Sequence, residues 1–100
     1  MLTTLPVRQL GITDMEITRV GFGAWAAGGG GWAFGWGPQD DDESFAAIRH
    51  AFERGVNWID TAPFYGWERA ERIVGKAIKG RRDAVHIFTK CGTLPDGKGG

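Results

Sequence analysis

Three side chains that can take part in proton transfer follow two apolar segments of the chain. Asp60 comes directly after the apolar run 56–59, and Tyr65 follows five residues later. Lys90 ends a second apolar run, residues 85–89. If the two runs are neighbouring parallel strands, their carboxyl ends lie at one edge of a sheet. The acid, the phenol and the amine would then meet there.

A carboxylate, a phenol and an ammonium group in one place can act as a general acid. A phenol alone is a poor acid at neutral pH, because its reference pKa is about 10. A nearby ammonium lowers that pKa, and a carboxylate beside the ammonium keeps it charged and oriented. Asp60, Tyr65 and Lys90 are therefore suited to protonating a carbonyl oxygen that gains negative charge. Singly, each has a structural explanation: a turn cap, a core ring and a charge leaving the sheet.

Other common chemical motifs are absent from the sequence. No GxGxxG stretch follows a strand and opens a helix, and there is no P-loop. His50 and His86 have no partner at metal-ligand spacing, so we predict no metal site. The glycine run 28–31 is too uniform for a phosphate cradle, and we interpret it as flexible.

The composition indicates one globular domain or part of one. The 100 residues are 42% hydrophobic, and 12 basic residues balance 12 acidic ones. This gives no electrostatic footprint for nucleic acid, and no basic run suggests a membrane surface. No apolar run approaches the roughly 18 residues of a membrane-spanning helix. Cys91 is the only cysteine and no secretory signal is present, which predicts a cytoplasmic location.

The elements that would position the three residues alternate between strands and helices. Residues 8–23 are predicted to form a hairpin followed by a strand, and Asp40 and Glu43 can form a capping box for the first helix. Strands are predicted at about 19–23, 56–60 and 85–90, and helices over 40–54 and 67–79. This α/β order predicts a parallel sheet whose strands are adjacent in chain order.

The spacing of the strands fits a barrel. A (β/α)8 TIM barrel of about 250 residues uses about 31 residues per βα unit. The chain would supply its N-terminal hairpin and about three βα units. A doubly wound sheet gives the same order of elements and stays open as an alternative.

Residues 24–39 are predicted to be a long irregular loop. Its aromatic residues are Trp25, Trp32, Phe34 and Trp36. Loops this long are uncommon unless they are functional or disordered. Two interpretations stay open: the rings pack on their own domain, or they form a lid or wall over a ligand.

Several short stretches, taken together, resemble a known family. They are GFGAW at 21–25, DTAPFYG at 60–66, Glu71 and Gly75 in the second helix, and Thr89-Lys90. Their order and spacing resemble the N-terminal part of the aldo-keto reductase family, and its bacterial general-stress branch in particular. The resemblance covers nearly all of the chain but only about a third of a normal family member.

The resemblance implies an NADP(H)-dependent oxidoreductase that reduces aldehydes or ketones to alcohols. Tyr65 would donate the proton, tuned by Lys90 and Asp60. The cofactor-binding residues would be Gly23, Ala24, Trp25 and Asp60. The wall of the site for the small carbonyl substrate would be Trp25, Trp32, Trp36 and Phe64.

One element of the family pattern lies outside these residues. The family uses a fourth catalytic residue, a His beyond its third strand. We therefore expect residues 1–100, as the N-terminal part of a single barrel domain, to be inactive alone. Open sheet edges would allow self-association. Two alternatives remain: a cofactor-sensing, non-catalytic subunit of the same fold that binds ion channels, or an inactive N-terminal fragment.

Overall fold

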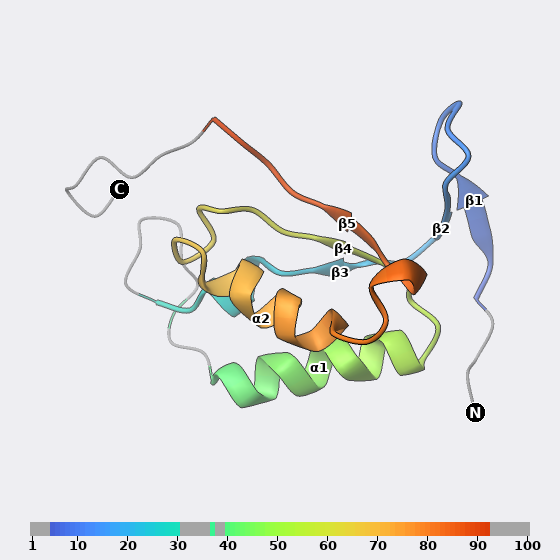
Figure 1. Cartoon of the computed structure of the whole chain (residues 1–100). Coiled ribbons are helices and arrows are strands. Elements are labelled where there is room, and N and C mark those ends of the chain that lie inside the picture. Colours follow the sequence, from blue (N-terminus) through green and yellow to red (C-terminus); the bar gives the residue numbers. More distant parts are fainter. Residues whose placement is uncertain (1–4, 31–36, 38–39, 93–100) are drawn as a thin grey trace.

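The computed structural model describes residues 5–30, 37 and 40–92. Its elements are β1 (Val7–Gln9), β2 (Glu16–Thr18), β3 (Phe22–Gly23), the 3-10 turn η1 (Trp25–Gly28), α1 (Asp41–Glu53), β4 (Trp58–Asp60), α2 (Arg69–Ile78), the 3-10 turn η2 (Arg82–Ala84) and β5 (His86–Phe88). Both helices lie on one face of the β3-β4-β5 sheet, and the β1-β2 hairpin stands at one end (Figure 1). In the part of the chain described here, no helix is long and apolar enough to cross a membrane.

The central sheet is parallel, with its strands in chain order. β3 pairs with β4 and β4 pairs with β5, so Phe22, Ile59 and Ile87 lie side by side. The predicted strand order is thereby confirmed. All three strands are shorter than predicted, and β5 ends at Phe88 instead of residue 90. β3 begins only at Phe22 because the chain bends at 19–20, where the Arg19 amide bonds to the Pro6 carbonyl oxygen at 3.2 Å.

The hairpin is held to the sheet by side-chain hydrogen bonds of two neighbouring residues, Asn57 and Trp58. Asn57 Oδ1 accepts a hydrogen bond from the Thr18 amide at 2.8 Å, and its Nδ2 donates to the Glu16 carbonyl oxygen at 2.9 Å. The indole Nε1 of Trp58 donates to the Thr18 carbonyl oxygen at 2.7 Å. The same indole lies against Gly21, where a Cβ atom would overlap it. The hairpin therefore caps the amino end of the strands through contacts that its own sequence does not reveal.

Asp40 is the N-cap of helix α1, as predicted. The Asp40 carboxylate accepts hydrogen bonds from the amides of Asp42 and Glu43, at 2.8 and 3.2 Å. These bonds satisfy two of the backbone amide donors that the first turn of a helix leaves without a partner. Gly55 follows the helix with φ 101°, a conformation that favours glycine and ends the helix near the predicted position.

Helix α2 begins at Arg69, two residues later than the predicted start at 67. Trp67 and Glu68 adopt left-handed backbone conformations, with φ 50° and 78°. The Glu68 amide bonds to the Pro63 carbonyl oxygen at 2.6 Å and closes the turn before the helix. This turn could not be predicted from the residue types, because left-handed conformations are rare for residues other than glycine, asparagine and aspartate.

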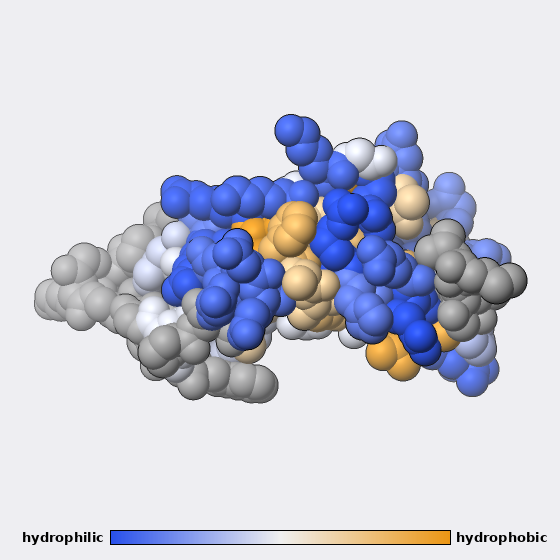
Figure 2. Space-filling view, turned by 90° about the horizontal axis from the view of Figure 1, so that it is seen from below, coloured by the Kyte–Doolittle hydropathy of each residue, from blue (hydrophilic) through white to orange (hydrophobic). Residues whose placement is uncertain are grey.

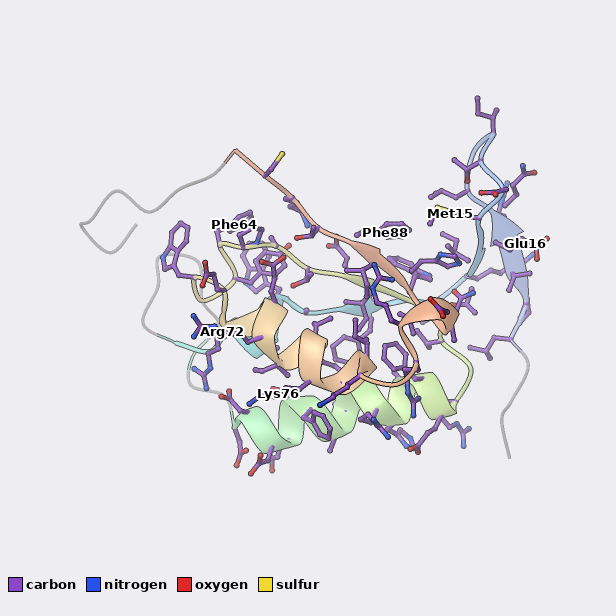
Figure 3. All side chains as sticks on the ribbon, viewed as in Figure 1. Met15, Glu16, Phe64, Arg72, Lys76 and Phe88 are labelled. Carbon is purple, nitrogen blue, oxygen red and sulfur yellow. The ribbon has the colours of Figure 1, made fainter. Side chains whose placement is uncertain are left out.

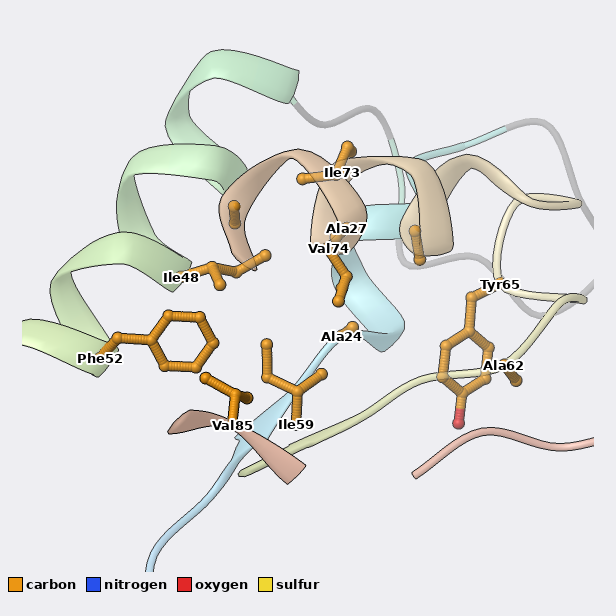
Figure 4. Packing of buried hydrophobic residues seen from close by; sticks show 12 residues of the cluster. Ala24, Ala27, Ile48, Phe52, Ile59, Ala62, Tyr65, Ile73, Val74 and Val85 are labelled. Carbon is orange, nitrogen blue, oxygen red and sulfur yellow. The ribbon is translucent and has the colours of Figure 1, made fainter. Parts of the chain in front are cut away.

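The apolar core lies between the helices and the sheet (Figure 4). Ile48 and Phe52 of α1 and Val74 of α2 pack over Ile59 of the central strand. Seen from the helix side, the surface is mostly hydrophilic with a narrow hydrophobic strip (Figure 2). The core fixes the helices over the sheet and with them the loop that carries Tyr65, whose residue is only 4% exposed.

The prediction of an irregular loop over 24–39 is wrong for its first residues. Residues 25–28 form the turn η1, and Ala24 and Ala27 are buried in the core. Gly28 is also buried, against the backbone of Tyr65 and Gly66. Trp32, Phe34 and Trp36 lie outside the described residues, so the two interpretations of their rings stay predictions.

Candidate functional site

The two predicted charges meet at the carboxyl end of the sheet. Asp60 is the last residue of β4, and Lys90 follows β5 by two residues. Lys90 Nζ lies 2.9 Å from Asp60 Oδ1 and donates a second hydrogen bond to the Thr61 carbonyl oxygen at 3.0 Å. The predicted ion pair is confirmed. Its side chains are 40% and 44% exposed, so the pair stands at an accessible edge.

Tyr65 lies beside this ion pair. Lys90 Nζ is 5.1 Å from the centre of its ring. The hydroxyl points toward the segment that follows β5 (Figure 4). Burial lowers the pKa of Lys90, but the hydrogen bond to Asp60, the nearby Tyr65 and the negative charge of Asp60 outweigh burial and raise it above the ordinary 10.5. Lys90 is therefore charged at neutral pH, as a partner of a phenol acid must be.

The Tyr65 ring sits in a group of aromatic side chains. Its centre is 5.0 Å from that of Trp25 and 4.9 Å from that of Phe64. Trp25 and Phe64 meet edge to face at 6.5 Å. Figure 3 shows Phe64 in the loop after β4, at the end of the sheet away from the hairpin residues Met15 and Glu16. These rings form an apolar wall next to the ion pair.

The backbone around Tyr65 is fixed by a contact between two glycines. A Cβ atom on Gly28 would lie 2.7 Å from both the Tyr65 carbonyl carbon and the Gly66 nitrogen. Gly66 itself has φ 66°. The interpretation of the glycine run as flexible is thus wrong at Gly28, where glycine serves close packing instead.

The predicted cofactor residues line the edge next to the ion pair. The Ala24 amide donates to the Asp60 carbonyl oxygen at 2.9 Å, which continues the β3-β4 pairing. Gly23 is exposed, and a Cβ atom there would meet nothing within 4 Å. Asp60 uses Oδ1 for Lys90, and within the described ranges its Oδ2 accepts no hydrogen bond. An open backbone edge beside a free carboxylate oxygen fits a sugar that bears hydroxyl groups.

Three residues that support the site were not among the predicted site residues. Thr61 offers its carbonyl oxygen to Lys90, and Thr89 Oγ1 donates to Glu71 Oε2 at 2.8 Å. Nothing in the residue types indicated these contacts, since they join separate elements. Trp32 and Trp36, predicted for the substrate wall, lie outside the described residues.

The site does not coincide with the hollow at the hairpin. That hollow, of about 550 Å³, is lined by Arg8, Gln9, Leu10, Ile17, Thr18, Arg19 and Trp58. It lies at the amino end of the strands, whereas Asp60 and Lys90 stand at the carboxyl end. In parallel α/β sheets the carboxyl end is where ligands bind, so the charge cluster is the candidate site.

Comparison with known proteins gives consistent matches. The model of the Aldo/keto reductase family matches residues 19–100. The chain is 48% identical over 80 residues to aldo-keto reductase YhdN of Bacillus subtilis, covering 78% of this chain and 23% of that protein. It is 42% identical over 92 residues to the NADH-specific methylglyoxal reductase of Escherichia coli, covering 90% of this chain and 27% of that protein.

Solved structures agree with these matches. The holo form of aldo-keto reductase AKR11C1 from Bacillus halodurans matches with a TM-score of 0.78 and 31% identity, over 94% of this chain and 28% of that one. An aldo-keto reductase from Klebsiella pneumoniae in complex with NADPH matches with a TM-score of 0.64 and 32% identity, over 76% of this chain and 24% of that one. These neighbours are (β/α)8 barrels, which confirms the predicted fold class over the doubly wound alternative. The chain spans about a quarter of the length of these proteins.

Proposed function

Because the chain belongs to the aldo/keto reductase family, we propose that it supplies the N-terminal part of an oxidoreductase active site that reduces aldehydes or ketones. Tyr65 is the proton donor, and Lys90 and Asp60 are its partners. Residues 1–100 form part of a single barrel domain and are inactive alone. The protein acts in the cytoplasm, in keeping with its single cysteine.

One observation carries this proposal. The Lys90 ammonium donates to the Asp60 carboxylate at 2.9 Å and to the Thr61 carbonyl oxygen at 3.0 Å, and it lies 5.1 Å from the centre of the Tyr65 ring. A cation held in this way stabilises negative charge on the phenol oxygen as the proton leaves it. Tyr65 can then protonate a carbonyl oxygen as that oxygen gains charge.

NADPH is the proposed cofactor, and NADH stays open because the Escherichia coli relative is NADH-specific by name. Gly23, Ala24 and Trp25 would lie along its ribose, with Asp60 Oδ2 as an acceptor for a ribose hydroxyl. When bound, the nicotinamide supplies the hydride. The residues of this chain hold the ribose edge and deliver the proton.

The proposed substrate is a small carbonyl compound that rests on the aromatic wall. Trp25, Phe64 and Tyr65 contact one another in a triangle, with ring centres 4.9 to 6.5 Å apart, and so form one continuous apolar surface. A dry apolar wall strengthens the hydrogen bond that a carbonyl oxygen accepts from a phenol. Trp32 and Trp36 are proposed to extend the wall.

The test is Tyr65→Phe in the complete protein. It removes only the hydroxyl, so the core position of the ring is kept. We expect kcat for reduction of a generic aldehyde to fall by at least about 100-fold, because general acid catalysis usually contributes a rate factor of at least that size. The Kd for NADPH, measured by fluorescence titration, should change less than about twofold, because the hydroxyl faces Lys90 rather than the proposed ribose edge.

Cys91→Ser is the matched control, because Cys91 is exposed and directly follows Lys90. It should keep the activity of the parent protein. A Tyr65→Phe protein that retains more than about a tenth of the parent rate would refute Tyr65 as the proton donor. A parent protein that binds NADPH yet turns over no carbonyl compound would instead indicate a cofactor-binding subunit.

A further inference from the structure

Lys90 lies beyond the last backbone hydrogen bond of its strand. The Thr61 amide donates to the Phe88 carbonyl oxygen at 2.8 Å, which closes the β4-β5 pairing. Among the described residues, no backbone hydrogen bond involves residues 89–92. The sheet therefore does not by itself fix the backbone from which the Lys90 side chain extends.

Beyond Phe88, a side-chain hydrogen bond holds the chain in place of the backbone pairing. Thr89, between Phe88 and Lys90, donates from Oγ1 to Glu71 Oε2 at 2.8 Å. Glu71 is in the first turn of α2, and its neighbour Ala70 is fully buried. Glu71 forms no ion pair within the described part of the chain, because Arg72 pairs with Glu68 instead. Its carboxylate thus serves as an anchor for Thr89.

The same turn of α2 also holds Tyr65. The Ala70 amide donates to the Tyr65 carbonyl oxygen at 3.2 Å. Two consecutive residues of one helix therefore bind the two loops that carry the proton donor and its ammonium partner. A rigid helix packed into the core is a more precise support than either loop alone.

We propose that Glu71 is a positioning residue of this site, which holds Lys90 at its place beside Tyr65 by binding Thr89. The inference rests on the proposed function, in which Lys90 is the partner of the proton donor Tyr65. Glu71 touches no reacting atom and acts only through Thr89. Loss of the bond frees the segment after Phe88 and lets the ammonium move away from the phenol.

The test uses Thr89→Val in the complete protein, because valine keeps the shape of threonine and removes the hydroxyl. A shift of about 1 Å at a catalytic group costs about 100-fold in rate. We expect kcat for aldehyde reduction to fall about 5- to 50-fold, while the NADPH Kd changes less than about twofold. Thr89→Ser, which restores the hydroxyl, should recover most of the rate.

A double-mutant cycle assigns the effect to the pair. Once Thr89→Val has removed the bond, adding Glu71→Ala should cost little more, because both changes break the same contact. Arg72→Gln is the control for α2, since it breaks an exposed ion pair on the same helix and should leave kcat unchanged. The crystal structure of Thr89→Val should show Lys90 Nζ displaced from Asp60 Oδ1.

Three results would overturn the inference. They are a Thr89→Val protein with parental kcat, a Thr89→Ser protein as slow as Thr89→Val, and single-variant losses that multiply in the double variant. If Thr89→Val does not fold, Glu71→Ala and Glu71→Gln decide the matter, and parental kcat in both refutes it. A normal Thr89→Val rate beside an inactive Tyr65→Phe protein would overturn the role of Glu71 alone and leave the proposed function intact.

Discussion

The contact between Gly28 and Gly66 makes a sharp prediction for Gly28→Ala. The new Cβ atom would lie 2.7 Å from the Tyr65 carbonyl carbon and the Gly66 nitrogen, and 3.0 Å from the Tyr65 carbonyl oxygen. All three are backbone atoms, which cannot rotate away as a side chain can. Gly28 is not among the residues with positive φ, so the substitution acts through steric overlap and not through backbone strain.

The size of the effect follows from these distances. Ordinary contacts of a Cβ atom begin at 3.4 Å, so the backbone at 65–66 must retreat by 3.4 minus 2.7, or 0.7 Å. Overpacking of this kind costs about 1–3 kcal/mol. With an unfolding entropy of about 2.1 cal/mol/K per residue, each kcal/mol lowers Tm by roughly 1–2 °C in a protein as long as these relatives. Because Tyr65 moves with the backbone, kcat should also fall, by about 10- to 100-fold.

The assay compares Gly28→Ala with Gly75→Ala, both in the complete protein. A Cβ atom on Gly75 would meet nothing within 4 Å, on an exposed position of α2. The same chemical change there should raise stability by about 0.5–1 kcal/mol, because alanine is the better helix former. Tm is measured by calorimetry and kcat with a generic aldehyde. A Gly28→Ala protein with parental Tm and kcat would show that the close approach does not hold Tyr65.

Two further predictions concern the supports of the site. Asn57→Ala should destabilise the protein by about 1–3 kcal/mol and speed hydrogen exchange of the Thr18 amide, because two bonds to the hairpin are lost; unchanged exchange at Thr18 would contradict this. Lys90→Met should cost at most about 1 kcal/mol at neutral pH, because the Lys90–Asp60 pair is 40% and 44% exposed. The pKa of Lys90 is raised in the folded state, so this stabilising contribution is present below pH 10.5 and is lost as pH rises through the folded pKa. The difference in unfolding free energy between the two proteins, measured by urea titration, should therefore be smaller at strongly alkaline pH than at neutral pH. A difference that grows with pH would refute this prediction.

The charge pair could be predicted because it depends on two simple rules. Apolar runs that alternate with helices form parallel strands, and the carboxyl ends of such strands share one edge. Asp60 lies opposite Phe88, and Lys90 follows Phe88 by two residues, so both charges lie at this edge of the sheet. Residue type and strand position were enough to bring the carboxylate and the ammonium together.

The supports of the pair could not be predicted in this way. Gly28 meets Gly66, Asn57 meets Thr18, and Thr89 meets Glu71, each across a gap of many residues. Glycine in a run is equally typical of a mobile loop and of close packing, and only the fold decides between them. The left-handed turn at Trp67 and Glu68 is a further case, since both residue types are compatible with a helix.

The charged pair and the residues that support it have different roles in the protein. Asp60 and Lys90 are partly exposed, and an exposed ion pair adds little to folding. The fold instead depends on the buried layer of Ile48, Ile59 and their neighbours between the sheet and the helices. Because Asp60 and Lys90 contribute little to folding, they can be replaced without unfolding the protein. Residues such as Gly28 and Asn57 join that layer to the site, so a change there should lower stability and activity together.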